Sequence, residues 1–63
     1  MTAKQREALA RLERANGGII DTGDASDFGD GWVWVLTPDT REVPVHHDRI
    51  RSWYVTPTGR VHA

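Results

Sequence analysis

Three histidines, His46, His47 and His62, are the first residues in this chain to consider for chemistry, because histidine binds zinc and can act as a general base. A zinc site needs three or four ligands at one point, and Asp48 would complete this set. In an extended segment, however, His46 and His47 point to opposite sides, so only one of them can join His62. The chain has no cysteine, and neither of its two serines has a recognisable nucleophile setting. We therefore expect no metal site, no cofactor and no enzyme activity.

Four aspartates recur every third residue in the segment 21–31, at Asp21, Asp24, Asp27 and Asp30. Clustered carboxylates are typical of calcium sites. An EF-hand loop instead has closely spaced acidic or amide ligands and a final glutamate, whereas this segment has a period of three and no glutamate. Its many turn-forming residues predict a long acidic loop. The loop either faces water or forms an acidic lip for a basic partner, with Phe28 as its anchor.

Arginine and aromatic residues are interleaved in the segment 49–54, a pattern that can contact phosphates and stack on bases. Residues 1–31 carry four basic and six acidic side chains, a net charge of −2, whereas residues 32–63 carry four and three, a net charge of +1. The whole chain has a formal charge of −1 and lacks the general basic field of most nucleic-acid binders. Nucleic-acid binding is therefore the alternative function, and its candidate residues are Arg41, His46, Arg49, Arg51 and Arg60.

The length of 63 residues and the lack of cysteine indicate one small domain, residues 1–63, held together by packing. No apolar run approaches the roughly 20 residues that span a bilayer, and the polar N-terminus does not resemble a signal peptide. We therefore expect a cytoplasmic protein without membrane contact. Arginine outnumbers lysine seven to one, which indicates a GC-rich coding sequence. Size and composition together suggest a protein encoded by a phage or mobile element.

Residues 2–16 have the pattern of one amphipathic helix. Thr2 and Gln5 fit a capping box, in which each side chain bonds the other residue's backbone N–H. Apolar residues recur at helical spacing at Ala8, Leu9, Leu12 and Ala15. The opposite side, which we expect to face water, carries Lys4, Glu7, Arg11 and Arg14. The segment 16–18, Asn-Gly-Gly, predicts the end of the helix, since glycine adopts the left-handed conformation at little cost.

The segment 31–36 has the strongest strand pattern, with β-branched and aromatic residues between a glycine and a Thr-Pro-Asp turn. A hairpin at that turn would place Trp34 opposite Val43. It would also place Trp32 opposite Val45 on the same face. This segment opens the β-rich half, residues 32–63.

Both faces of this strand are apolar, because Val33 and Val35 point away from the two tryptophans. We therefore expect a central strand with the helix on one side. On the other side lies either more sheet or an exposed, adhesive surface.

The remaining segments are short. Residues 46–52 fit one helical turn, with Ile50 facing inward. The segments 53–55 and 60–62 are predicted strands, and the Pro- and Gly-containing segment 56–59 is predicted to be the turn between them.

These elements predict an α+β fold in which an N-terminal helix packs on a small antiparallel sheet or open barrel of four to five strands. The expected core comprises Leu9, Leu12, Ile19, Trp34, Val43, Ile50 and Val55. The acidic loop, the Trp-bearing strand, the tight hairpin and the later strands resemble SH3-like small β-barrels in outline, over residues 19–63. That resemblance implies a groove for proline-rich peptides, although His47 stands where the groove would have a tyrosine. The leading helix and final hairpin also resemble a winged helix, but no later segment is long enough for a recognition helix.

The function we expect is that of a small non-enzymatic interaction module, a protein-binding adaptor, inhibitor or regulator. Aromatic side chains dominate the energetics of protein interfaces, so we expect the interface in the acidic loop and at exposed tryptophans. Its candidate residues are Asp24, Asp27, Phe28, Trp32 and Trp53. Pro44 belongs at a strand end or sheet edge, and a homodimer through that edge is a further expectation.

Overall fold

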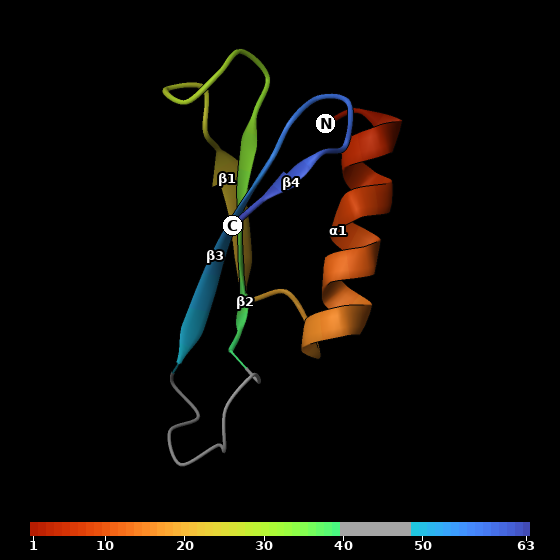
Figure 1. Cartoon of the computed structure of the whole chain (residues 1–63), viewed down its shortest axis with the longest axis vertical. Helices are drawn as coiled ribbons and strands as arrows, with labels where there is room; N and C mark the ends of the chain where they lie inside the picture. The colour runs from red at the N-terminus through yellow and green to blue at the C-terminus, as the bar shows by residue number, and fades with distance from the viewer. Residues whose placement is uncertain (40–48) are drawn as a thin grey trace.

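In the computed structural model, residues 1–39 and 49–63 are described, and within them one helix precedes four strands. Helix α1 (Ala3–Asn16) is followed by β1 (Asp21–Asp24), β2 (Val33–Pro38), β3 (Ile50–Val55) and β4 (Val61–His62). The strands form an antiparallel sheet in the order β1-β2-β3-β4. Figure 1 shows α1 standing beside the sheet, along one of its faces. The expected α+β fold, with an N-terminal helix on a small antiparallel sheet, is confirmed.

Both ends of α1 are capped, as the sequence predicts. Thr2 Oγ1 accepts a hydrogen bond from the Gln5 backbone N–H at 3.1 Å, and Gln5 Oε1 accepts one from the Thr2 backbone N–H at 2.9 Å. This reciprocal pair is the capping box. At the other end, Gly17 is left-handed with φ 80°, and the Gly18 N–H donates to the Glu13 carbonyl at 2.9 Å.

Strand β2 lies between β1 and β3, so both of its edges are paired. Its buried Val35 lies opposite Thr22 of β1 and Trp53 of β3. Strands β3 and β4 form a hairpin in which Tyr54 lies opposite His62. The predicted hairpin and its turn are confirmed, although the first strand begins at Ile50 and not at residue 53, and the second at Val61 and not at residue 60.

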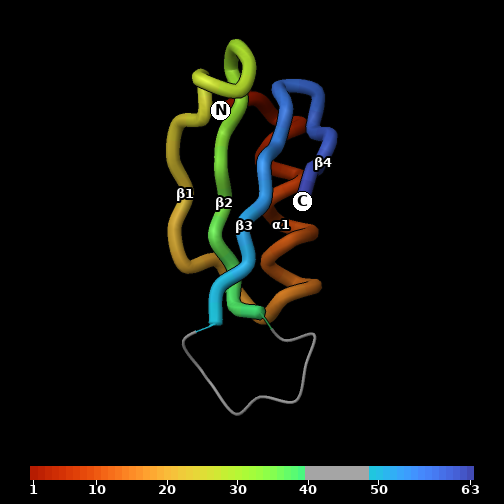
Figure 2. The backbone as a smooth tube through the Cα atoms, turned by 60° about the vertical axis from the view of Figure 1, so that its left-hand side comes forward, coloured from red at the N-terminus to blue at the C-terminus, as the bar shows by residue number. Residues whose placement is uncertain are grey.

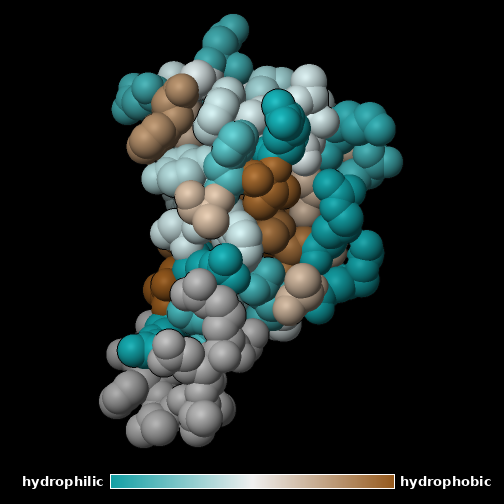
Figure 3. All heavy atoms as spheres, in the orientation of Figure 1, coloured by the Kyte–Doolittle hydropathy of each residue, from teal (hydrophilic) through white to brown (hydrophobic). Residues whose placement is uncertain are grey.

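The core lies between α1 and the face of the sheet that contains Val35. Ala8, Leu12, Val35 and Val55 form a buried cluster, and Leu9, Ile19, Val33 and Trp53 pack against it. Residues that recur at helical spacing on α1 therefore pack on alternate residues of β2 and β3, which point to the same face of the sheet. In Figure 3 hydrophobic side chains gather between the sheet and the hydrophilic outer side of the helix.

Gln5 ties the helix to the sheet and is 1% exposed. Its Nε2 donates to the Gly31 carbonyl at 2.6 Å and to the Val55 carbonyl at 3.4 Å, while its Oε1 is bonded in the capping box. Thr2 Oγ1 also donates to the Pro57 carbonyl at 2.7 Å. The start of α1 is thereby fixed against Gly31 in the loop that leads into β2, the end of β3 and the β3–β4 turn.

The predicted pairing of the Trp-bearing strand is wrong. Trp34 lies between Gly23 of β1 and Tyr54 of β3, so both edges of β2 are already paired at this position and Val43 cannot pair with it. The Thr-Pro-Asp pattern suggested a tight turn, but the ladder continues through it: Pro38 pairs with Ile50, and the Asp39 N–H donates to the Arg49 carbonyl at 3.0 Å. The expected partners in the segment 43–45, including the proposed edge at Pro44, lie outside the described residues. The predicted acidic loop also begins too early, because residues 21–24 form β1.

Two of the expected core residues are misplaced. Ile50 is 51% exposed, and Trp34 is only partly buried, because strand alternation places both on the face turned away from the helix. The helical turn expected over 46–52 is wrong from Ile50 onward, where β3 begins, and residues 46–48 lie outside the described part. Of the other expected core residues that are described, Leu12 and Val55 are buried, and Leu9 and Ile19 pack against them.

Replacing Gln5 with alanine should lower the free energy of unfolding by about 2 kcal/mol, because the buried Val55 carbonyl and the part-buried Gly31 carbonyl lose their donor. Urea and thermal unfolding, followed by circular dichroism, measure this change. Glu13→Ala, at an exposed position of the same helix, should change the stability by less than about 0.5 kcal/mol. Equal effects of the two substitutions would contradict the role given to Gln5.

Replacing Gln5 with glutamate should make the loss of stability depend on pH. A protonated glutamic acid can still donate to the Gly31 carbonyl, whereas a buried carboxylate would face carbonyl oxygens without a donor. The protonated form is therefore favoured in the folded state, and its stabilisation is lost as the pH rises. The urea midpoint of Gln5→Glu, relative to wild type at the same pH, should be closer to wild type at pH 4 than at pH 7.

Candidate functional site

A row of aromatic residues crosses the face of the sheet that is turned away from α1. The register places Trp34 beside Tyr54, and Tyr54 beside His62. On the other side of Trp34 lies Gly23, where a Cβ atom would come within 2.4 Å of Trp34 Cζ2, so the indole lies directly over the glycine. Figure 2 shows the sheet from this side, with α1 behind it.

Two more aromatic side chains extend this row. The Phe28 ring lies 4.4 Å from the Tyr54 ring, and the Trp32 ring is stacked on His62 at 5.1 Å between centroids. Phe28 makes the contact expected of a loop anchor, yet it is 64% exposed. We call the set Phe28, Trp32, Trp34, Tyr54 and His62 the aromatic face.

The loop that carries Phe28 is closed by short-range hydrogen bonds. The Ala25 N–H donates to the Trp32 carbonyl at 2.9 Å, and the Phe28 N–H donates to the Ala25 carbonyl at 2.9 Å. Asp24 Oδ2 accepts from the Ser26 backbone N–H at 3.3 Å and from Ser26 Oγ at 2.7 Å. These bonds position the phenyl ring over the sheet and hold the Asp24 carboxylate at the base of the loop.

A pocket of about 450 Å³ opens where the N-terminus of α1 meets the start of β2 and the β3–β4 turn. Its apolar walls are Met1, Trp32, Val33 and Pro57, and its polar lining includes Thr2 and Gln5 of the capping box. Among the described side chains that line it, that of Asp24 carries a charge. We call it the N-terminal pocket. Since Trp32 belongs both to this pocket and to the aromatic face, the two are continuous.

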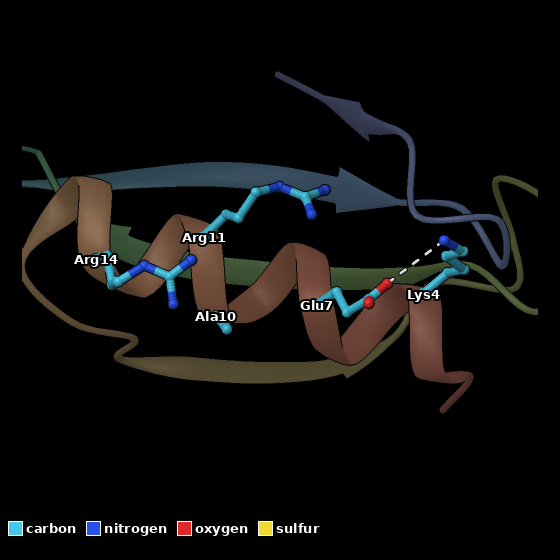
Figure 4. A pocket seen from close by; sticks show the side chains of 5 residues that line it. All are labelled: Lys4, Glu7, Ala10, Arg11 and Arg14. Carbon is cyan, nitrogen blue, oxygen red and sulfur yellow. Dashed lines mark ion pairs between the residues drawn. The ribbon is translucent and has the colours of Figure 1, made fainter.

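A second hollow, of about 480 Å³, lies on the outer side of the helix. Figure 4 shows its five lining residues, Lys4, Glu7, Ala10, Arg11 and Arg14, all of them on α1. Lys4 Nζ lies 3.7 Å from Glu7 Oε2, and both side chains are well exposed. The four charged residues are exposed, as the sequence predicts for this side of the helix. The hollow is thus a groove between solvated side chains of a single element.

Four of the five residues predicted to bind a protein are gathered at one end of the molecule. Phe28 and Trp32 belong to the aromatic face, Asp24 lines the N-terminal pocket, and Asp27 is exposed beside Phe28 in the loop. Trp53 lies on the opposite face of the sheet, opposite Val35, where it packs against the core.

The environment of Trp53 accounts for its position. Its Nε1 donates to Thr37 Oγ1 at 2.9 Å, which gives the indole N–H a partner in a part-buried site. The Arg51 guanidinium lies over the indole, 3.8 Å from the ring centroid. Trp53 therefore stabilises the helix side of the sheet and is separated from Trp32 by the sheet itself.

The residues of the nucleic-acid alternative are spread over the molecule as far as they are described. Arg51 lies on Trp53, whereas Arg49 precedes β3 and Arg60 precedes β4, near opposite ends of β3. A six-residue strand is about 20 Å long, so the two end positions do not make one compact basic patch. Arg41 and His46 lie outside the described residues.

The aspartates of the acidic loop are not gathered around one point. Within residues 1–39 and 49–63, no group of three or more histidine, aspartate or glutamate side chains is arranged to hold a metal ion. The four aspartates Asp21, Asp24, Asp27 and Asp30 are all exposed.

Sequence reasoning missed Trp34, Tyr54 and His62 as surface residues. The alternation of side chains along 32–36 places Trp34 and Val35 on opposite faces, and this can be read from the sequence. The alternation does not reveal which of the two faces the helix covers. Tyr54 and His62 join Trp34 only through the strand register, which a single sequence does not reveal.

Replacing Gly23 with alanine should displace the Trp34 indole without unfolding the protein, because the new methyl group would overlap the ring. We expect changed near-UV circular dichroism and a shifted Trp34 indole N–H signal, with unchanged far-UV circular dichroism. Glu13→Ala, at an exposed position of α1, should leave the indole signal close to its wild-type position. An unmoved Trp34 signal in Gly23→Ala would contradict the packing described here.

Within the described ranges, α1 is neither long nor apolar enough to pass through a bilayer. Comparison with known protein families, curated proteins and solved structures finds no match to this chain.

Proposed function

We propose that this protein is a non-enzymatic binding module and that the aromatic face is where it binds a protein partner. The observation that carries the proposal is the continuous set of partly exposed rings on a sheet face that no described element covers. Isolated exposed apolar residues are normal, but a contiguous patch of this kind is typical of an interaction surface.

The rings are suited to this role because they are already ordered. Trp34 is seated on Gly23, Phe28 on Tyr54 and Trp32 on His62, so each ring has a packing partner in the free protein. Large, rigid side chains lose little conformational entropy on binding and are enriched at the centres of protein interfaces.

The charge around the aromatic face supports a protein partner over a nucleic acid. Asp21 lies on this face beside Leu36, and the described strand positions of the face include no lysine or arginine. Asp27 and Asp30 lie in the loop that carries Phe28. Carboxylates repel phosphates, whereas nucleic-acid binding depends on neutralising them.

The wider setting of this module is also a proposal. The antiparallel strand order supports the resemblance to SH3-like barrels, but we base the function on the aromatic face and not on that analogy. Carboxylates at both ends of β1, Asp21 and Asp24, oppose pairing of this edge with a second copy. Composition alone supports a cytoplasmic regulator encoded by a phage or mobile element.

Peptide selection tests the proposed function without a known partner. A random peptide library is selected on the immobilised wild-type protein, and each enriched peptide is titrated against the Phe28→Ala and Arg14→Ala variants. Phe28→Ala should weaken binding about tenfold or more, since truncating a central aromatic residue costs about 1–2 kcal/mol. Arg14→Ala, on the outer side of α1, should change affinity less than about twofold.

Thermal unfolding of both variants provides the folding control, because Phe28 is largely exposed and its removal should leave the transition in place. If no peptide is enriched, or if the enriched peptides bind Phe28→Ala as tightly as wild type, the aromatic face is not the binding surface.

A further inference from the structure

The N-terminal pocket has features that the aromatic face alone does not explain. Its walls are apolar, and a carboxylate belongs to its lining. Its volume of about 450 Å³ lies within the range of small-ligand pockets, about 300–1,000 Å³. A concave, mostly apolar site with a placed charge favours a ligand group of opposite charge on an apolar stem.

We propose that the N-terminal pocket receives an arginine side chain of the protein partner that binds the aromatic face. The inference rests on the proposed function, because Trp32 is shared by the pocket and the face. It specifies the partner: a segment with an arginine next to the apolar residues that cover the rings.

Asp24 supplies the charge. Its Oδ2 is held by the backbone N–H and hydroxyl of Ser26, which orients the carboxylate, and its Oδ1 has no partner among the described residues. The guanidinium of an arginine side chain can pair with this carboxylate and lie against the Trp32 indole. The methylene groups of the same side chain can contact Val33 and Pro57. An anionic group would instead be repelled by Asp24.

The pocket is formed before any ligand enters. Thr2 Oγ1 donates to the Pro57 carbonyl at 2.7 Å, and Gln5 Nε2 donates to the Gly31 carbonyl at 2.6 Å. The first bond joins the start of α1 to the β3–β4 turn, and the second joins it to the loop that leads into β2. These three segments form the pocket. Binding therefore requires little rearrangement of the backbone, which lowers its entropic cost.

The test uses a blocked peptide of leucine and alanine residues with one central arginine, titrated into ¹⁵N-labelled protein. A matched peptide carries citrulline, which has nearly the shape of arginine without its charge, and a third carries lysine. The arginine peptide should shift the Trp32 indole and Ser26 amide signals. It should bind about tenfold or more tightly than the citrulline peptide, because a charge-assisted pair is lost in the latter. The lysine peptide should bind more weakly than the arginine peptide, since an ammonium lacks the planar, paired donors.

Two substitutions separate a pocket effect from a general charge effect. Asp24→Asn retains an acceptor for Ser26 but removes the charge, and it should weaken arginine-peptide binding about tenfold. Asp30→Asn changes the net charge of the same loop equally but is exposed and lies outside the pocket lining, and it should change the affinity less than about twofold. Thermal unfolding confirms that both variants are folded.

The outcomes distinguish this inference from the proposed function. Equal binding of the arginine and citrulline peptides, or equal effects of Asp24→Asn and Asp30→Asn, would overturn the arginine pocket. The proposed function would still stand if library peptides bind in a Phe28-dependent way. Binding of a ten-nucleotide oligo-dT with shifts at Trp32 and Trp34 would overturn both. Pocket shifts that appear on concentrating the protein without peptide would show that a second copy fills the pocket, and would overturn a separate partner.

Discussion

The buried amide of Gln5 is the interaction on which the arrangement of helix and sheet depends. A helix of 14 residues with a narrow apolar stripe offers little surface to hold it in one position on a small sheet. The Gln5 side chain adds direction, because its donors meet the carbonyls of Gly31 and Val55 while its oxygen completes the cap. Hydrogen bonds are directional and an unpaired buried amide is costly, so this contact selects one placement of the helix start. The same placement forms the N-terminal pocket, whose lining includes Gln5 itself.

The second constraint is that a single helix can cover only one face of the sheet. Val35 and Val55 lie under α1 and are fully buried, whereas Trp34 and Tyr54, next to them in sequence, lie on the other face and remain partly exposed. In a chain of this size, aromatic residues are normally needed for the core. Here Trp53 alone of the three tryptophans packs on the helix side, through Thr37 and Arg51. Apart from Trp53, the large aromatic rings therefore lie outside the core cluster, on and beside the face that α1 leaves uncovered.

Several elements could be predicted from sequence because their causes are local. The capping box of Thr2 and Gln5 and the glycine stop depend on residues within one or two helical turns, and both are observed. The turn at 56–59 is likewise set by its own residues and by the bonds of Thr56 to Arg60 and Gly59. The pairing of β2 was mispredicted for the opposite reason. A turn pattern at Pro38 favours a local hairpin. In the structure β2 instead pairs with β1 along one edge and with β3 along the other, where Pro38 lies opposite Ile50.

The class of the fold, the limits of the helix and the segregation of valines and tryptophans to opposite faces of one strand could all be predicted from the amino-acid sequence. It also drew attention to Phe28, Trp32 and Asp24, because turn-rich acidic and aromatic segments lie at surfaces. Three features needed the three-dimensional arrangement: which face the helix covers, the position of Trp53 on the helix side and of Trp34 on the other face, and the pocket lined by both Asp24 and Pro57. The physical reason is that periodicity specifies sides relative to a strand, whereas pairing across distant segments depends on register and on buried hydrogen bonds such as those of Gln5.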